Sequence, residues 1–279
     1  MEVSVIIPVY NAEQWLQKCI ASVLIHDCVK EIILINDGST DSSLSIMSSL
    51  ALKESRIILL SHPLGKNLGR SASRNLGIRH AGSNWIAFLD ADDYFLDNRF
   101  DIILHSAKEG YYGMIKSETL VKREGANLGK DKTGIQNNIK PSDLYDFLTT
   151  QGDQYFSLIS LTVKKEAVIA IGGFDENLPV GEDTDFIWRL SYCHSLVSLD
   201  HTNPIAIRTI HGKNSYSTTN SGRYLFYKKW LNQNDFPLST EAKRRIYNAY
   251  VYYHPLHQKW SNGFVRILIK LHQYLIALR

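Results

Sequence analysis

An apolar run that ends in a cluster of acids is the feature that most constrains how this chain can fold. Residues 85–89 have only aromatic and aliphatic side chains, and Asp90, Asp92 and Asp93 follow directly. A strand without charge is typical of a parallel sheet buried on both faces, and such sheets bind ligands at the carboxyl ends of their strands. The acids therefore form either a divalent-cation site, for which carboxylate oxygens are suitable ligands, or a solvated turn before the next helix.

Segments with strand and helix patterns alternate over the first part of the chain. We predict strands at residues 4–9, 31–36, 56–60 and 85–89, and helices at 12–24, 42–52 and 68–80. This alternation with short connections predicts a doubly wound, mostly parallel α/β sheet. The loops after the first, second and fourth strands then open at one edge, so we expect Tyr10, Asn11, Asp37 and Asp90 to converge there. Taken singly, Asn11 also fits a helix cap and Asp37 a turn residue.

Two arginines lie on one face of the predicted helix at 68–80. Arg70 and Arg74 are one turn apart, so their side chains are neighbours on the helix surface. They could pair with a phosphate or with the acidic cluster. A solvated basic face is the alternative.

A second acidic pair and a histidine follow in the later part of the chain. Glu182 and Asp183 stand at the start of a predicted helix, whose N-terminus favours ionised carboxylates. An ionised Asp183 near an acceptor hydroxyl is a suitable general base, and simple helix capping is the alternative. His211 follows a strand predicted at 204–210 and is either exposed or a nitrogen ligand for a divalent ion.

Composition excludes several classes of protein. The chain has 279 residues, a net charge of +3 and 44% hydrophobic residues, as in ordinary soluble globular proteins. We find no signal peptide and no apolar run long enough for a membrane span. Three scattered cysteines fit neither a disulfide framework nor a zinc motif, so we expect buried free thiols and a cytoplasmic location. The basic residues gather only near the C-terminus, which argues against nucleic-acid binding.

Six motifs in fixed order resemble the family 2 glycosyltransferases, which have the GT-A fold. The motifs lie at residues 5–11, 36–41, 69–77, 90–93, 172–175 and 182–183, within about residues 3–215. The resemblance implies a nucleotide-sugar half at about 1–110 and an acceptor half at about 111–220, which together make a GT-A domain over 1–220. Residues 221–279 match none of the motifs, and we expect a helical, basic, tyrosine-rich extension.

The resemblance also implies roles for individual residues. Substrate contacts are implied for Pro8, Tyr10, Asn11, Asp37, Ser39, Gly69, Arg70, Arg74, Asp90, Ala91 and Glu182. Asp37 would bind the base, usually uracil. Asp92 would coordinate Mg²⁺ or Mn²⁺ on the diphosphate, Asp90 would be shared between metal and ribose, and His211 stands where some members have a further metal ligand. Asp183 would be the catalytic base.

The expected reaction is metal-dependent and inverts the anomeric centre. One hexosyl or N-acetylhexosaminyl group would pass from a nucleotide-diphosphate sugar, with UDP favoured, to a hydroxyl of a glycan or lipid-linked glycan, as in bacterial surface polysaccharide assembly. Residues 186–190 lack the Gln-x-x-Arg-Trp signature of processive synthases, which favours transfer of a single sugar. A non-catalytic sugar-nucleotide-binding protein is one alternative. A nucleotidyltransferase is less favoured, because residues 8–11 contain no glycine.

The C-terminal extension has a distinct charge and pattern. From Lys243 onward there are seven Lys or Arg residues and no acid. A helix predicted at 263–278 has a wide apolar face, which must pack on the body, on a second subunit in a homodimer, or on a membrane surface. Packing on the body is the default expectation. A peripheral contact with the inner face of the membrane is the alternative that the basic charge favours.

Overall fold

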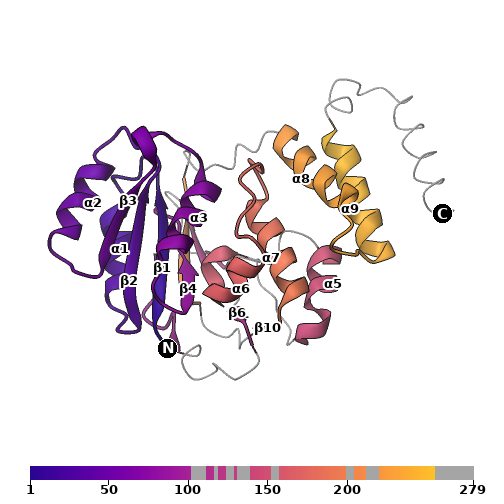
Figure 1. The fold of residues 1–279 in the computed structure, drawn as a ribbon, viewed down its shortest axis with the longest axis horizontal. Helices are drawn as coiled ribbons and strands as arrows, with labels where there is room; N and C mark the ends of the chain where they lie inside the picture. The colour runs from indigo at the N-terminus through magenta and orange to yellow at the C-terminus, as the bar shows by residue number, and fades with distance from the viewer. Residues whose placement is uncertain are drawn as a thin grey trace. The chain divides into compact units, whose positions relative to one another are not determined.

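The computed structural model describes residues 1–101, 111–115, 119–123, 129–130, 139–151, 157–198, 204–211 and 220–254. These residues form two compact units (Figure 1). The first contains residues 1–177 and 182–214, and the second contains residues 178–181 and 215–279. All the residues to which the sequence assigns a catalytic, substrate or metal role belong to the first unit.

A seven-stranded sheet forms the centre of the first unit. Its order is β10-β6-β9-β4-β1-β2-β3. The strands are β1 (Val3–Val9), β2 (Val29–Asn36), β3 (Ile57–Ser61), β4 (Trp85–Phe88), β6 (Gly113–Ile115), β9 (Leu161–Lys164) and β10 (Leu196–Ser198). β1 runs parallel to β2 and β4, whereas β9 is antiparallel to β4 and β6. The prediction of a mostly parallel α/β sheet is therefore confirmed.

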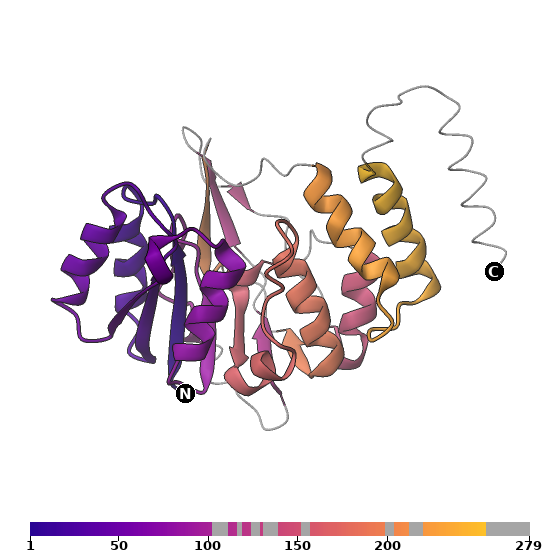
Figure 2. The ribbon, with the colours of Figure 1, turned by 45° about the horizontal axis from the view of Figure 1, so that its top comes forward.

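Helices cover both faces of this sheet and explain why β1 and β4 carry no charged side chain. The helices are α1 (Leu16–Leu24), α2 (Ser43–Ala51), α3 (Arg70–His80), α5 (Pro141–Gln151), α6 (Lys165–Ala170) and α7 (Glu182–Cys193), with 3₁₀ turns η1 (Pro63–Gly65) and η3 (Leu158–Ser160). Figures 1 and 2 show α1 and α2 on one side of the strands and α3 on the other. The strand order reverses between β1 and β4, and a doubly wound sheet binds ligands at such a switch point.

α3 packs unusually close to the sheet because it contains Gly77. A Cβ atom at Gly77 would lie 2.6 Å from Cγ2 of Ile6 in β1 and 3.1 Å from Cδ1 of Ile35 in β2. Glycine at this position lets the helix axis approach the strands. The close approach brings Arg74, one turn earlier on α3, against the carboxyl ends of the strands.

A second sheet, of four strands, places the residue that follows its strand β11 beside the acidic loop after β4. Its order is β5-β11-β7-β8. The strands are β5 (Tyr94–Phe95), β7 (Thr119–Arg123), β8 (Gly129–Lys130) and β11 (Ala206–Ile210). In the β5–β11 pair, Ala206 lies opposite Phe95 and Ile207 opposite Tyr94. This register carries the residue after β11, His211, back toward the acids that precede β5.

Several local expectations are corrected. α1 begins at Leu16, with Trp15 as its N-cap residue, and not at residue 12. Asn11 is not a helix cap, because its backbone is left-handed, with φ of 51°, and its side chain bonds the next loop. The alternating pattern of residues 156–163 predicts one strand, but the described residues from 158 onward form the turn η3 followed by β9. Residues 124–131 have the composition of an exposed loop, but residues 129–130 form β8, which sequence patterns miss because the strand is so short.

Burial of the three free thiols is also corrected. Cys19 is buried, Cys28 is partly buried and Cys193 is exposed. Cys19 lies on the face of α1 that packs on the sheet, whereas Cys193 is the last residue of α7. Among the described residues, none of the cysteines forms a disulfide.

The second unit contains two helices joined by stacked aromatic side chains. α8 (Asn220–Asn232) and α9 (Thr240–Tyr253) are packed against each other. The rings of Tyr224 and Tyr250 stack with centroids 5.0 Å apart, and those of Tyr227 and Tyr253 stack 5.9 Å apart. Ser239 caps α9 as its sequence position predicts, since its Oγ accepts a hydrogen bond from the amide of Ala242.

One expectation about the C-terminal part falls on residues that the structure does not describe. The helix predicted at 263–278 lies outside the described residues. Among the residues that are described, no helix combines the length and hydropathy required to cross a bilayer.

Candidate active site

The loops after β1 and β2 are fastened to each other by side-chain hydrogen bonds. The Oδ1 atom of Asn11 accepts from the amide of Thr40 at 2.8 Å, and the amide of Asn11 donates to Oγ of Ser39 at 3.2 Å. Ser39 also donates to the carbonyl of Val9 at 3.3 Å. Tyr10, between these anchors, is 53% exposed. The two loops thus form a fixed edge with an accessible aromatic ring.

Asp37 holds the loop that leads into α3. It is 4% exposed. Its carboxylate accepts from the amide of Leu68 at 2.7 Å and from the amide of Gly69 at 3.1 Å. Nε2 of His62 lies 3.6 Å from the same carboxylate and 2.9 Å from Oγ of Ser73. In this structure Asp37 therefore fixes the segment before α3, which is the candidate nucleotide wall, and its contact with the base stays a prediction.

Gly38 lets the backbone after β2 lie close to the segment before α3. Its φ is +73°, in the left-handed region that favours glycine. A Cβ atom there would lie 2.7 Å from the amide nitrogen of Asn67 and 2.8 Å from the carbonyl of Gly65. The Asp37-Gly38 pair therefore joins β2 to the residues before α3 through backbone contacts that only glycine allows.

Arg74 joins the acidic loop after β4 to the start of α7. Its Nη2 atom lies 2.8 Å from Oδ1 of Asp90, and its Nη1 atom lies 3.1 Å from Oε1 of Glu182. Arg70 reaches the same Glu182 oxygen through Nε at 2.9 Å. Arg74 therefore pairs with the acidic cluster through Asp90, which is one of the predicted arrangements. Arg70 pairs instead with Glu182, outside that cluster.

The charges in this network set one another's pKa values. Burial disfavours the charged form of Arg74, but the carboxylates of Asp90 and Glu182 outweigh burial and raise the pKa of Arg74. Desolvation raises the pKa of Asp90, but Arg74 more than offsets it, so the pKa lies below its usual range. Burial, and then the charge of Asp183, raise the pKa of Glu182, while the two guanidinium groups offset part of that rise.

Asp92 and His211 meet on the other side of the acidic loop. Nε2 of His211 lies 3.1 Å from Oδ2 of Asp92. Asp93 is 7% exposed and accepts from the amide of Thr209 at 2.7 Å, which ties β11 to the acidic loop. The sequence position of Asp93 did not reveal this anchoring role, since the bond depends on the register of β11. Ala91, between the acids, is buried.

The donor set at this point fits a hard divalent cation. Burial, and then the neighbouring Asp90, raise the pKa of Asp92, and a bound cation would relieve this repulsion. The carboxylate oxygens of this loop suit Mg²⁺ or Mn²⁺. Within the described part of the chain, no group of three or more His, Cys, Asp or Glu side chains is placed to hold a metal ion. A diphosphate and water would therefore have to complete the coordination.

Asp183 occupies the first turn of α7, next to Glu182. Its Oδ1 atom accepts from the amide of Thr184 at 2.8 Å, and the residue is partly exposed. Further along α7, Arg189 bonds Asp185 at 2.8 Å and the carbonyl of Gly173 at 2.8 Å. These buried contacts fix the helix that carries Asp183. The N-terminus of α7 is thus rigidly placed beside Arg70 and Arg74.

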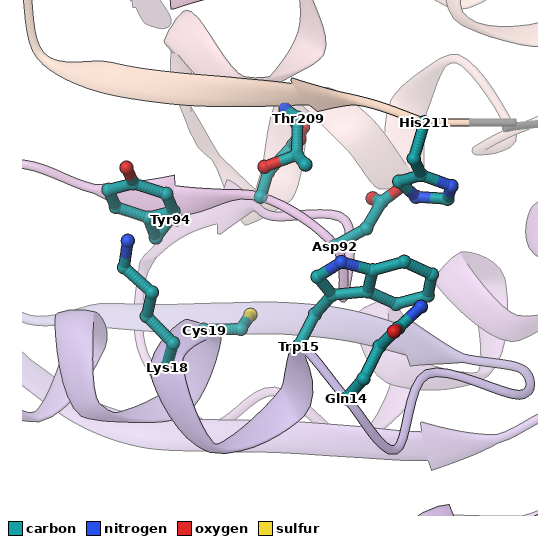
Figure 3. A pocket seen from close by; sticks show the side chains of 9 residues that line it. Gln14, Trp15, Lys18, Cys19, Asp92, Tyr94, Thr209 and His211 are labelled. Carbon is teal, nitrogen blue, oxygen red and sulfur yellow. Dashed lines mark hydrogen bonds and ion pairs between the residues drawn. The ribbon is translucent and has the colours of Figure 1, made fainter. Parts of the chain in front are cut away.

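A cavity of about 210 Å³ lies beside Asp92 on the α1 side of the loop (Figure 3). Its lining consists of Gln14, Trp15, Lys18, Cys19, Asp92, Asp93, Tyr94, Thr209 and His211. The indole of Trp15 stacks on the imidazole of His211, with ring centroids 4.0 Å apart and an interplanar angle of 17°. Sequence reasoning placed Trp15 only among the apolar positions of a helix. No local pattern signals a contact with a residue so distant in the sequence.

A family model matches the part of the chain that carries the loops after β1, β2 and β4. The model of glycosyl transferase family 2 matches residues 4–172. An uncharacterized glycosyltransferase of Haemophilus influenzae is 32% identical over 168 residues, which cover 60% of this chain and 63% of that protein. The chain therefore spans less than two thirds of the length of this relative.

Two solved structures share the fold at low sequence identity. S. aureus TarS 1–349 in complex with UDP-GlcNAc has a TM-score of 0.65 and 18% identity over 95% of this chain and 75% of that chain. The mannosyltransferase PcManGT from Pyrobaculum calidifontis, in complex with GDP-Man and Mn²⁺, has a TM-score of 0.63 and 14% identity over 100% of this chain and 81% of that chain. The chain has the GT-A fold and belongs to glycosyl transferase family 2.

Proposed function

We propose that this chain transfers one sugar from a nucleotide-diphosphate sugar to a hydroxyl of a glycan or lipid-linked glycan, with inversion at the anomeric carbon. The observation that supports this most strongly is the Arg74 bridge. It joins Asp90, at the end of the donor strand β4, to Glu182, at the start of the helix that carries Asp183. One buried guanidinium thereby joins the acidic loop after β4 to the start of the helix that carries Asp183.

Asp183 is the better candidate for the base within the acid pair. The Oε1 atom of Glu182 is bonded by both Arg70 and Arg74, and the side chain is 4% exposed. Asp183 is partly exposed at the same helix N-terminus, and within the described part of the chain its Oδ1 atom accepts hydrogen bonds only from Thr184. In the proposed reaction Asp183 takes the proton of the acceptor hydroxyl as that oxygen attacks the anomeric carbon. The nucleoside diphosphate then leaves in the same displacement.

Asp92 and His211, which the structure brings together, are proposed as ligands for Mg²⁺ or Mn²⁺, and Asp90 would join them as a third ligand only when the donor and the cation bind. When bound, such an ion neutralises the charge that develops on the leaving diphosphate. The arginine bridge keeps Asp90 ionised, and the contact with His211 orients the carboxylate of Asp92. The presence of Mn²⁺ in the structure of PcManGT supports this assignment by analogy.

UDP is the favoured nucleotide of the donor. Tyr10, Asn11 and Ser39 lie at the fastened loop edge, and Asp37 lies in the adjoining wall, where the family resemblance implies the base. The structure of TarS with UDP-GlcNAc supports a UDP donor. Because PcManGT is in complex with GDP-Man, a GDP-sugar is the competing donor class.

The experiment that tests the proposal is a panel of UDP- and GDP-sugars with Mn²⁺. Release of the nucleoside diphosphate would be measured, together with the thermal shift of the protein. We expect release from one donor class and its loss when EDTA removes the metal. If every nucleotide sugar left both the melting temperature and the release at background, the proposal would be wrong. A thermal shift with no release under any condition, acceptor included, would favour the non-catalytic binding protein.

We also propose that the enzyme works in the cytoplasm and meets its acceptor at the inner face of the membrane. On α9, Lys243 and Arg244 are exposed, and basic residues near an anionic bilayer attract it. Flotation of the full chain with anionic liposomes should fall when both residues are changed to Glu. Lys53→Glu, an exposed substitution in the first unit, is the control. Equal flotation of all three proteins would contradict membrane contact through α9.

A further inference from the structure

We infer that Trp15 is a positioning residue for the metal end of the donor site, because its indole holds the imidazole of His211 in place beside Asp92. The inference rests on the proposed function, since it assigns a role toward the cation that Asp92 and His211 would bind. It adds a residue from α1, an element that carries none of the metal ligands. Figure 3 shows the three side chains together.

Two contacts from different elements fix the ring of His211. The stack with Trp15, at 4.0 Å and 17°, sets the plane of the imidazole. The contact between Nε2 and Oδ2 of Asp92, at 3.1 Å, sets which ring edge faces the carboxylate. A metal ligand bonds through a lone pair in the ring plane, so a fixed plane aims the nitrogen. Stacking therefore fixes the orientation of the ring plane, which decides whether the histidine can bind metal.

The position of Trp15 is itself fixed by the first turns of α1. Its amide donates to the carbonyl of Ala12 at 3.0 Å, and the next residue, Leu16, is fully buried. One turn later, the thiol of Cys19 contacts the carbonyl of Asp90 at 3.7 Å. Oγ of Ser22 then accepts from the amide of Phe95 at 3.1 Å. One stripe of α1 thus lies along the whole acidic loop, and Trp15 is the part of that stripe that reaches His211.

A cavity lies next to the stack of Trp15 and His211, so the indole contact is needed to keep the imidazole from moving into that space. The space of about 210 Å³ is lined by both Trp15 and His211. Removal of the indole would enlarge this space and give the imidazole more rotamers to sample. Each binding event would then have to order the ring, and ordering a mobile side chain weakens binding. A purely structural role for Trp15 predicts a loss of stability without this specific loss of metal affinity.

The test measures Mn²⁺ affinity by EPR in the full chain, with and without UDP. We expect Trp15→Ala to weaken Mn²⁺ binding about three- to tenfold, the range expected from loss of one aromatic stack. Trp15→Phe, which keeps a smaller ring, should retain part of the Mn²⁺ affinity that Trp15→Ala loses. Trp85, another partly buried indole, lies at the far end of β4, so Trp85→Ala should leave Mn²⁺ affinity unchanged.

A double-mutant cycle with His211→Ala separates positioning from general damage. If Trp15 acts through His211, Trp15→Ala will weaken Mn²⁺ binding in the wild-type background and have no further effect in His211→Ala. Equal Mn²⁺ affinity in wild type, Trp15→Ala and Trp15→Phe would overturn this inference alone. An undiminished effect of Trp15→Ala in the His211→Ala background would overturn it too. If the wild-type chain bound no Mn²⁺ with or without UDP, the metal assignment and this inference would both be wrong.

Discussion

The guanidinium of Arg74 lies 2.8 Å from the carboxylate of Asp90 and is almost fully buried. The same group bonds Glu182 at 3.1 Å. One cation on α3 therefore holds together the acidic loop after β4 and the N-terminus of α7. The donor and acceptor ends of the candidate site are placed by this shared contact, which makes Arg74 a sensitive position for both stability and function.

Removal of Arg74 should be strongly destabilising. Arg74→Met would leave Glu182 buried with only Arg70 as a partner, and breaking a buried ion pair typically costs about 3–5 kcal/mol in the free energy of unfolding. Arg79→Met, on the exposed end of the same helix, should change it by less than about 0.5 kcal/mol. Urea denaturation of both variants measures the difference. Equal stabilities would show that the bridge contributes nothing to the fold.

Replacement of Asp183 should abolish transfer and spare donor binding. Asp183→Asn keeps the size of the side chain and its hydrogen bond to Thr184, but the amide cannot take a proton. Loss of a general base slows a reaction by about 10²–10⁴-fold. Turnover would be compared with nucleotide affinity from calorimetry on the same sample. Wild-type turnover in Asp183→Asn would rule out this residue as the base.

Substitution of Gly38 should disturb the candidate nucleotide wall far more than substitution of Gly65. Both glycines have a positive φ, of 73° and 62°, so alanine is strained by about 1 kcal/mol at each. Only at Gly38 would the new Cβ also overlap backbone atoms, at 2.7 and 2.8 Å, which adds about 1–3 kcal/mol. Gly38→Ala should therefore show the lower melting temperature and the weaker nucleotide binding. The reverse order would contradict the close approach seen here.

The buried His26 should make stability fall at mildly acidic pH. Burial, and then the nearby Arg99, lower the pKa of His26 below its ordinary value of 6.5. The unfolded chain therefore takes up the proton first, so stability present above pH 6.5 is lost as the pH falls through the folded-state pKa. His26→Phe should flatten the pH dependence of the free energy of unfolding. The slope will not vanish, because burial also lowers the pKa of His194. An unchanged slope in His26→Phe would contradict this account.

The sequence by itself determined the fold class and the position of the acids along it. Mostly apolar strands alternate with amphipathic helices at short range, and this periodicity is a local property that each segment carries alone. It predicted the mostly parallel sheet and placed Asp37 and Asp90 at strand ends. The order of motifs predicted the family. Short strands such as β8 were missed, since two residues have no period to detect.

Only the tertiary structure decided which side chains meet. The partners Arg74 and Glu182 are 108 positions apart, and Asp92 and His211 are 119 apart. These pairs depend on the depth of α3 against the sheet and on the register of β11 with β5, neither of which local periodicity encodes. The same holds for Trp15, which reads as one more apolar helix residue until β11 brings His211 onto its ring. Contacts between distant segments arise from packing, and so the details of the site emerge only in the folded chain.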